Sequence, residues 1–194
     1  MNQTIQNLIK AFIGESQARN RYTYYAKVAK KEGYEQIAGV FMETADQEKT
    51  HAKRLFEHIQ DLKNKSKEKL DEIKVEIEAP TNYSTTIGNL KSAIAGENHE
   101  STKMYPNFAQ ISRKEGFAQI ASRMESIAIA EKHHEERFKK LLKEITDNKV
   151  FKKSKKVQWT CRECGYAHFG QEAPKLCPAC DHPQAYYQLK CEKY

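Results

Sequence analysis

Apolar residues recur at alternating steps of three and four along four long segments of the chain. The segments span about residues 5–32, 34–62, 84–116 and 117–146, and the clearest apolar series, in the last of them, is Ile120, Met124, Ile127, Phe138, Leu141 and Ile145. This spacing places one apolar stripe on one face of an α-helix. Thr4 and either Ser84 or Thr85 are suited to cap the first and third helices. The pattern therefore predicts a mainly α fold, a bundle of four long helices.

The two halves of this helical region repeat each other. Residues 32–38, EGYEQIA, match residues 115–121, EGFAQIA. At the same offset, a Glu-x-x-His pair that ends at His51 matches a pair that ends at His134. The helical region is therefore two copies of one helical hairpin.

The copies differ in length by one residue. Gly14-Glu15 matches Gly96-Glu97, but with the offset shortened by one. The second copy thus carries an extra residue inside its first helix, close to Pro106, and a helix absorbs a single insertion as a π-bulge. We expect this irregularity between about Glu100 and Phe108.

A long polar segment, from Lys63 to about Ser84, joins the two hairpins. It is too long for an ordinary tight turn between helices. A bundle with one long crossover is the arrangement of ferritin-like folds.

Acidic and imidazole side chains interrupt the apolar stripes at matching places. They are Glu15, Glu48, His51, Glu97, Glu131 and His134. Ionised carboxylates in a bundle core cost several kcal/mol each unless they are paired or bind a metal. Hard carboxylate oxygens with two imidazoles suit iron or manganese. We expect a two-metal site with Glu48 and Glu131 bridging, Glu15 and Glu97 terminal, and the two histidines as nitrogen ligands.

One acidic residue breaks the symmetry of this set. Glu100 lies three residues after Glu97, where the first copy has Ala18. It is a seventh potential ligand on one side only, so one metal could exchange His51 for Glu100 as its charge changes.

Two tyrosines, Tyr22 and Tyr105, align across the repeat and could hydrogen-bond the ligating carboxylates. We therefore expect them, with Glu100 and His51, to take part in catalysis. His58, His99 and His133 are expected to point away from the site.

The C-terminal segment carries all five cysteines. Four of them form two Cys-x-x-Cys pairs, Cys161 with Cys164 and Cys177 with Cys180, which is metal-ligand spacing and not a disulfide framework. Four thiolates bind either zinc or a single iron, and the spacing leaves both open. A dense set of aromatic residues nearby favours the iron. Cys191 is expected to be an incidental thiol and His182 structural.

The net charge of +7 comes largely from two lysine-rich runs, residues 63–69 and 152–156, which resemble solvated linkers. Because stacking aromatics do not accompany them, we expect no nucleic-acid binding. The sequence shows neither a secretory signal nor an apolar run long enough for a membrane span. Together with unpaired thiols, this predicts a cytoplasmic protein without membrane association.

Taken together, the duplicated Glu-x-x-His bundle, the asymmetric Glu97-x-x-Glu100 and the two cysteine pairs resemble rubrerythrin over the whole chain. The resemblance implies a ferritin-like di-iron bundle over residues 1–147, a linker over 148–156 and a rubredoxin-like Fe(Cys)4 domain, a small β domain, over 157–194. Asp181 follows the fourth cysteine where rubredoxins usually have glycine, and aspartate tolerates left-handed backbone.

The resemblance also implies a non-haem di-iron peroxidase that reduces hydrogen peroxide to water in oxidative-stress defence. Electrons would come through the rubredoxin-like iron from an external donor, a rubredoxin or an NAD(P)H-dependent reductase. A separate reductase is needed because the chain lacks a Gly-x-Gly-x-x-Gly fingerprint. A head-to-tail homodimer would bring each cysteine domain beside the partner's bundle. The alternatives are a ferritin-like iron store, a manganese catalase, and a non-enzymatic electron carrier or zinc-ribbon module.

Overall fold

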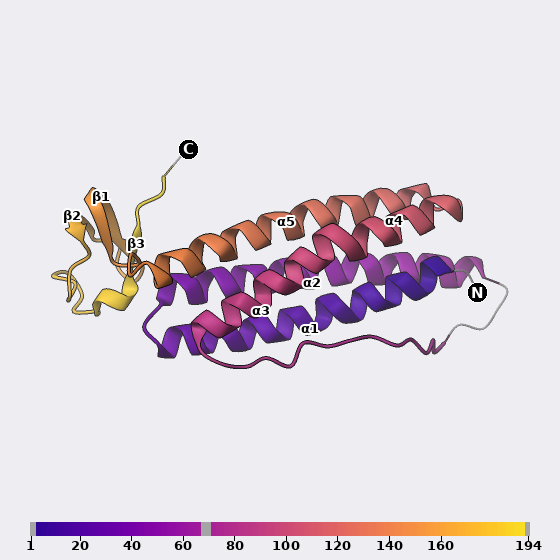
Figure 1. The fold of residues 1–194 in the computed structure, drawn as a ribbon, viewed down its shortest axis with the longest axis horizontal. Helices are drawn as coiled ribbons and strands as arrows, with labels where there is room; N and C mark the ends of the chain where they lie inside the picture. The colour runs from indigo at the N-terminus through magenta and orange to yellow at the C-terminus, as the bar shows by residue number, and fades with distance from the viewer. Residues whose placement is uncertain (1–2, 67–70, 193–194) are drawn as a thin grey trace.

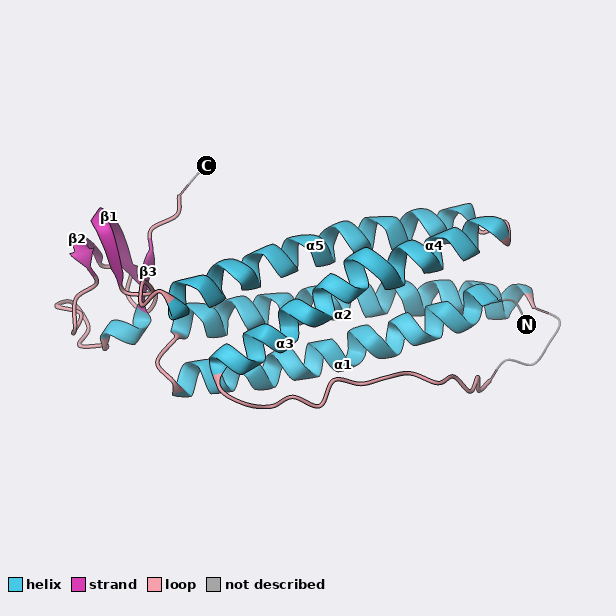
Figure 2. Cartoon of the chain, in the orientation of Figure 1, coloured by secondary structure: helices cyan, strands magenta, loops and turns pink. Residues whose placement is uncertain are grey.

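The computed structural model describes residues 3–66 and 71–192 of the chain. A four-helix bundle is followed by a small three-stranded sheet at one end of it (Figure 1). The bundle consists of α1 (Gln3–Lys31), α2 (Glu35–Lys65), a composite third helix and α5 (Ala118–Thr146). This confirms the expected ferritin-like architecture, and Figure 2 shows that the strands are confined to the C-terminal region.

The third helix of the bundle is composite. It consists of α3 (Thr86–His99), a π-helical turn η1 (Glu100–Met104) and α4 (Tyr105–Lys114). The backbone N–H of Tyr105 donates to the carbonyl of Glu100, five residues earlier, which is the π-helical bond. The irregularity predicted between Glu100 and Phe108 is confirmed, and Pro106, which has no N–H to donate, lies two residues after its end.

The N-terminus of α3 is capped by an expected residue, whereas that of α1 is not. Thr85 caps α3 as expected, since its side chain accepts from the N–H of Gly88. Thr4 lies inside α1 and is not its cap. Instead, Glu115 accepts from the N–H of Thr4 at 2.8 Å and from its hydroxyl at 2.6 Å. Its counterpart Glu32 accepts from the N–H of Thr86 at 3.0 Å, so each hairpin turn supplies an anion to a helix N-terminus of the other hairpin.

The apolar core of the bundle is divided into two clusters. One contains Tyr22, Tyr25, Phe41 and Phe138, and the other contains Leu8, Leu55, Tyr105, Ile120 and Met124. Along α1, α2 and α5, the acidic and histidine positions fall between the residues of these two clusters. The polar site is therefore enclosed by apolar packing towards both ends of the bundle.

The described part of the crossover, residues 71–85, contains neither helix nor strand and runs lengthwise beside α1 (Figure 1). The hydroxyl of Tyr25 donates to the carbonyl of Asn82 at 2.8 Å, which ties the end of the crossover to α1. None of the helices in the described ranges carries an apolar stretch of the length that a bilayer crossing needs.

The C-terminal sheet has the strand order β2-β1-β3 and is antiparallel. Its strands are β1 (Lys152–Cys161), β2 (Ala167–Glu172) and β3 (Tyr187–Leu189), with a 3-10 turn at Gln184–Tyr186. Trp159 pairs with His168 on one side and Leu189 on the other. Much of the segment expected as a linker, residues 148–156, is thus the first half of β1. The lysine run predicts solvation, and most of its side chains are indeed exposed, although its backbone belongs to a strand.

The sheet contacts the end of the bundle near the start of α2. The rings of Tyr34 and Phe151 stack with centroids 6.4 Å apart and an interplanar angle of 7°. Lys153 forms an ion pair with Glu144 at the end of α5. The cysteine domain therefore stays at the bundle end and does not fold back along its own helices.

Candidate metal centres

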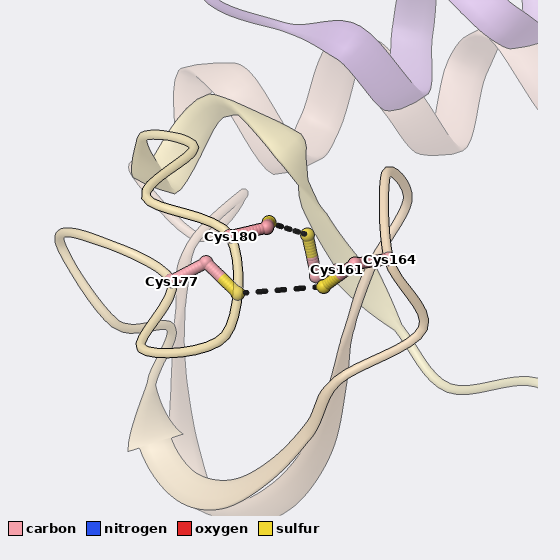
Figure 3. Close-up of side chains that lie close together, drawn as sticks. All are labelled: Cys161, Cys164, Cys177 and Cys180. Atoms are coloured by element: carbon pink, nitrogen blue, oxygen red, sulfur yellow. Dashed lines mark hydrogen bonds between the residues drawn. The ribbon is translucent and has the colours of Figure 1, made fainter.

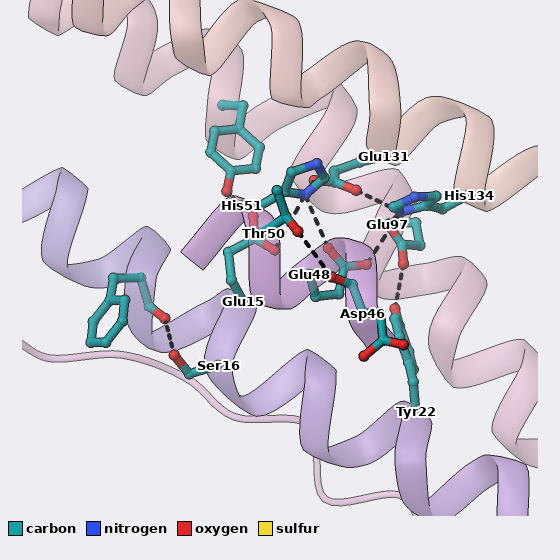
Figure 4. A network of polar contacts seen from close by, with 12 residues as sticks. Glu15, Ser16, Tyr22, Asp46, Glu48, Thr50, His51, Glu97, Glu131 and His134 are labelled. Atoms are coloured by element: carbon teal, nitrogen blue, oxygen red, sulfur yellow. Dashed lines mark hydrogen bonds and ion pairs between the residues drawn. The ribbon is translucent and has the colours of Figure 1, made fainter. Parts of the chain in front are cut away.

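Four elements bring the six predicted ligands of the bundle together (Figure 4). α1 supplies Glu15, α2 supplies Glu48 and His51, α3 supplies Glu97, and α5 supplies Glu131 and His134. All are buried except His51, whose side chain is 17% exposed. A Glu and a His three residues apart lie on one face of a helix, so α2 and α5 each present such a pair to the bundle axis.

Two of the carboxylates each face both histidines. Glu48 places Oε2 at 3.1 Å from Nδ1 of His51 and Oε1 at 3.2 Å from Nδ1 of His134. Glu131 places Oε1 at 2.9 Å from His51 and Oε2 at 2.7 Å from His134. Each carboxylate therefore presents one oxygen to each side, which is the arrangement of a bridging ligand.

The other two carboxylates each face one histidine. Glu15 lies 3.7 Å from Nδ1 of His51, and Glu97 lies 3.5 Å from Nδ1 of His134. The ligand atoms accordingly form two metal-sized groups, and these share Glu48 and Glu131. The geometry agrees with two adjacent sites with one terminal carboxylate and one imidazole each.

Tyr22 and Tyr105 hydrogen-bond the terminal carboxylates in a crossed pattern. The hydroxyl of Tyr22, on α1, donates to Glu97 on α3, and the hydroxyl of Tyr105 donates to Glu15 on α1. Each hairpin thus holds the terminal carboxylate of the other one. Burial and the nearby glutamates raise the pKa of both phenols, so both remain protonated donors.

Glu100 is in neither of the two ligand groups. It is the first residue of the π-helical turn, and a Cβ built on Gly14 would lie 4.0 Å from its Oε1. Burial and the charges of the neighbouring glutamates raise the pKa of its carboxyl, which shows that Glu100 is electrostatically coupled to the cluster. Glu100 therefore lies beside the six ligands, and its role as an alternative ligand remains a prediction.

The donor set fits a pair of cations. Buried oxygens of all four carboxylates, and Nδ1 of His134, lack hydrogen-bond partners among the described residues. Burial and the charge of Glu48 raise the pKa of Glu15 to about 7. Burial lowers the pKa of His134, but the close carboxylates of Glu131, Glu48 and Glu97 outweigh this and raise it to about 12. The cluster requires positive charge, which protons or metal ions can supply.

This requirement predicts how pH affects the metal-free protein. The pKa of Glu15 rises on folding from 4.5 to about 7 and that of His134 from 6.5 to about 12, so the folded chain binds more protons. The stability that these two groups contribute is therefore present at acidic pH and is lost as pH rises, from about 4.5 upward for Glu15 and from about 6.5 upward for His134. Denaturant titrations with a chelator should show the free energy of unfolding falling between about pH 5 and pH 8. The metal-loaded protein is the control, and a rise without metal would contradict the prediction.

One buried carboxylate next to the site was not predicted. Glu135 is fully buried and accepts from Nδ2 of Asn98 at 3.0 Å and from Nζ of Lys132 at 2.7 Å. Burial raises its pKa, but the hydrogen bonds outweigh this and lower it to about 2. The backbone carbonyl of Asn98 also accepts a hydrogen bond, at 2.6 Å, from the hydroxyl of Thr102 inside the π-helical turn. The sequence feature that could have identified Glu135 as buried is its position, four residues after Glu131 on the same face of the helix.

The four cysteines of the C-terminal domain converge as predicted (Figure 3). The Sγ atoms of Cys161 and Cys180 are 3.8 Å apart, and those of Cys164 and Cys177 are 3.6 Å apart. Tetrahedral coordination with bonds of about 2.3 Å requires sulfur atoms about 3.8 Å apart. The distances thus suit one tetrahedral ion and are far longer than a disulfide bond.

The two cysteine pairs have the same backbone geometry. The N–H of Gly165 donates to the carbonyl of Cys161, and the N–H of Asp181 donates to that of Cys177, both at 2.9 Å. Gly165 has φ 77° and Asp181 has φ 58°. The expectation that Asp181 would adopt left-handed backbone in place of glycine is confirmed.

The remaining cysteine and histidine are placed as expected. Cys191 is exposed and lies outside the group of four. His182 lies edge-on to Tyr186 with ring centroids 4.5 Å apart, and its Nδ1 is 3.1 Å from the carbonyl of Cys180. His182 therefore packs against the knuckle as a structural residue.

Comparison with known proteins covers both parts of the chain. The family model for rubrerythrin matches residues 6–142, and the model for the rubrerythrin rubredoxin-like domain matches residues 159–188. A putative rubrerythrin of Methanocaldococcus jannaschii is 56% identical, over 100% of this chain and 96% of its own length. Rubrerythrin-1 of Clostridium acetobutylicum is 50% identical, over 99% of this chain and 96% of its own length.

A solved structure of nigerythrin in a partially reduced state is also similar. It has a TM-score of 0.64 at 30% identity, and the match covers 98% of this chain and 88% of that one. Sequence and fold therefore agree along the whole length. The chain belongs to the rubrerythrin family, with the carboxylate and histidine cluster of its di-iron site and the four-cysteine cluster of its rubredoxin-like iron.

Proposed function

We propose that this protein is a peroxidase that reduces hydrogen peroxide to water, with electrons passed through the iron of the four-cysteine site. The observation that carries the proposal is the combination, in one chain, of two metal sites sharing Glu48 and Glu131 with a separate tetrahedral thiolate site. A pair of irons supplies the two electrons that cleavage of a peroxide O–O bond consumes. A single iron held by four thiolates exchanges one electron at a time, which suits it to re-reduce the pair.

Each protein group has a role in this proposal. Glu48 and Glu131 would be shared by the two irons, and Glu15 with His51 and Glu97 with His134 would complete the two sites. Tyr22 and Tyr105 hold the terminal carboxylates through hydrogen bonds, which fixes the ligand oxygens before a metal binds. The cycling of iron oxidation states has a parallel in a relative, since one nigerythrin structure is described as fully reduced and all ferrous.

Replacing Glu100 by alanine should leave iron binding in the bundle intact but slow peroxide turnover about 10- to 100-fold. The reason is its position: it lies outside both ligand groups, but its carboxyl interacts with the ligand glutamates and would be available to a more highly charged metal in place of His51. Iron content by mass spectrometry and kcat with peroxide measure the two effects separately. Glu100→Gln is a size-matched control that should be nearly as slow. Unchanged turnover in both variants would remove Glu100 from the mechanism.

The external donor distinguishes this function from its alternatives. Peroxide consumption should depend on a reduced rubredoxin or on NAD(P)H with a separate reductase, and it should release no oxygen. An oxygen electrode and the absorbance of NAD(P)H measure both. Steady oxygen release without a donor would indicate a catalase, and iron deposition without peroxide turnover would indicate a store. Such a protein would act in oxidative-stress defence in the cytoplasm, where its thiols stay reduced.

We further propose a head-to-tail homodimer as the functional unit. The helix from His134 to Thr146 spans roughly 20 Å, and the cysteine domain lies beyond it at the bundle end (Figure 1). In a head-to-tail pair, each cysteine domain would lie beside the partner's di-iron site, which shortens the path for electrons.

This assembly predicts complementation between two inactive variants. Cys177→Ala lacks the thiolate site and Glu131→Ala lacks the di-iron site. Co-refolded together, they should recover about a quarter of the wild-type activity, because half of the dimers are mixed and each has one intact electron path. Activity no greater than that of the separate variants would indicate electron transfer within one chain.

A further inference from the structure

We propose that a groove beside the di-iron site binds organic hydroperoxides, and that Gly14 and Gly96 keep it open to them. This inference rests on the proposed peroxidase function and specifies its substrate class. The groove has a volume of about 690 Å³ and lies between α1, the composite third helix and crossover residues 76–80.

The groove reaches the metal-binding cluster. Glu100 is part of its lining, and its Oε1 lies 4.0 Å from the position of a Cβ on Gly14, the residue before the ligand Glu15. Gly14 and Gly96 line it too, and each directly precedes a terminal carboxylate, Glu15 or Glu97. Two residues without side chains and one carboxylate of the groove lining are therefore neighbours of the cluster's terminal carboxylates, in sequence or in space.

Neither glycine is required by the helix or by its packing. The glycines with positive φ are Gly33, Gly116 and Gly165, so Gly14 and Gly96 have ordinary helical backbone. A Cβ at Gly96 would meet nothing within 4 Å, and one at Gly14 would meet only Oε1 of Glu100 at 4.0 Å. Glycine inside a helix costs about 1 kcal/mol relative to alanine. Glycine occurs at this position in both copies of the repeat, despite its cost in helix stability. We infer that the glycines are present because they leave room in the groove.

The groove is larger and less polar than hydrogen peroxide needs. A water molecule takes about 30 Å³ of liquid volume, and hydrogen peroxide has only two oxygen atoms. Grooves of several hundred Å³ are typical of sites for organic ligands. The apolar lining residues come from the crossover and from the third helix: Ile77, Ala79, Pro80, Ala95, Met104 and Phe108. These surfaces suit an alkyl or aryl group whose peroxide end points to Glu100.

The reaction balances in the same way as for hydrogen peroxide. The O–O bond of the organic hydroperoxide breaks, and the molecule takes up two electrons and two protons. One alcohol and one water leave. The electrons are those that the external donor delivers through the four-cysteine site.

Turnover of cumene hydroperoxide and of hydrogen peroxide by the full-length, iron-loaded protein tests the inference. The wild type should reduce both. In Gly96→Leu, the added side chain enters the groove, so kcat/KM for cumene hydroperoxide should fall at least about tenfold more than kcat/KM for hydrogen peroxide. Leucine favours helix more than glycine does, so folding is not at risk. Lys91→Leu, an exposed position of α3 outside the groove lining, is the matched control and should leave the ratio unchanged.

Binding of the product alcohol gives a second readout that needs no turnover. Ligand-observed NMR should detect 2-phenyl-2-propanol bound to the wild type, with binding weakened in Gly96→Leu and kept in Lys91→Leu. Reduction of hydrogen peroxide alone, without cumene hydroperoxide turnover or alcohol binding, would overturn the inference and leave the proposed function standing. Failure with both peroxides would overturn the proposed function, and the alcohol would then test the groove by itself.

Discussion

Replacing Glu131 by alanine is expected to abolish metal binding at both positions of the bundle. The carboxylate lies 2.9 Å from His51 through one oxygen and 2.7 Å from His134 through the other, so its loss removes a ligand from both sites. Metal analysis after anaerobic loading with ferrous iron should find the four-cysteine iron but not the di-iron pair.

Two comparison variants make this result specific. Glu97→Ala removes a carboxylate that belongs to one group only, so it should impair mainly the site next to His134. Glu136→Ala removes an exposed carboxylate from the same helix as Glu131 and should leave the iron content unchanged. A Glu131→Ala protein that still binds two irons in the bundle would contradict the assignment of bridging ligands.

Replacing Cys177 by alanine is expected to remove the thiolate-bound iron and stop donor-driven turnover. Cys177 is buried in a small core with Trp159, Ala173 and Tyr187, and a domain of this size depends on its metal for stability. The ferric-thiolate colour should therefore disappear and the near-ultraviolet signal of Trp159 should weaken.

The bundle of this variant should keep its own chemistry. Reduced chemically and mixed with peroxide, it should complete one turnover, because no group of the di-iron site has been touched. Cys191→Ala changes an exposed thiol outside the cluster and is the matched control. If Cys177→Ala turned over peroxide with the natural donor at the wild-type rate, electrons would reach the bundle by another path.

The features predicted best are those that depend on the spacing of residues in the sequence. A one-residue shift between two repeats requires an insertion, and the π-helical turn at Glu100–Met104 accommodates it. Fixed spacing likewise placed the Glu-x-x-His pairs and the cysteine pairs, because residues three apart share a helix face and short loops hold two thiolates together.

The features predicted least well depend on which distant residues meet. The tyrosines align in sequence, but only the packing of α1 against the third helix decides that Tyr22 contacts Glu97 and Tyr105 contacts Glu15. The anion at the start of α1 is Glu115, which is 111 residues from Thr4 along the chain. Local patterns carry no information on such partners, which is why Thr4 was expected as a cap.

The visible spectrum of the anaerobically reduced protein, recorded before and after one equivalent of hydrogen peroxide, tests the central proposal most directly. The ferric-thiolate colour should be bleached by the reductant and should return on adding peroxide, because an iron held by the four cysteines would supply an electron to the oxidised bundle site. A reduced protein that stays colourless after peroxide, or a four-cysteine site that holds only zinc, would contradict the proposed electron path.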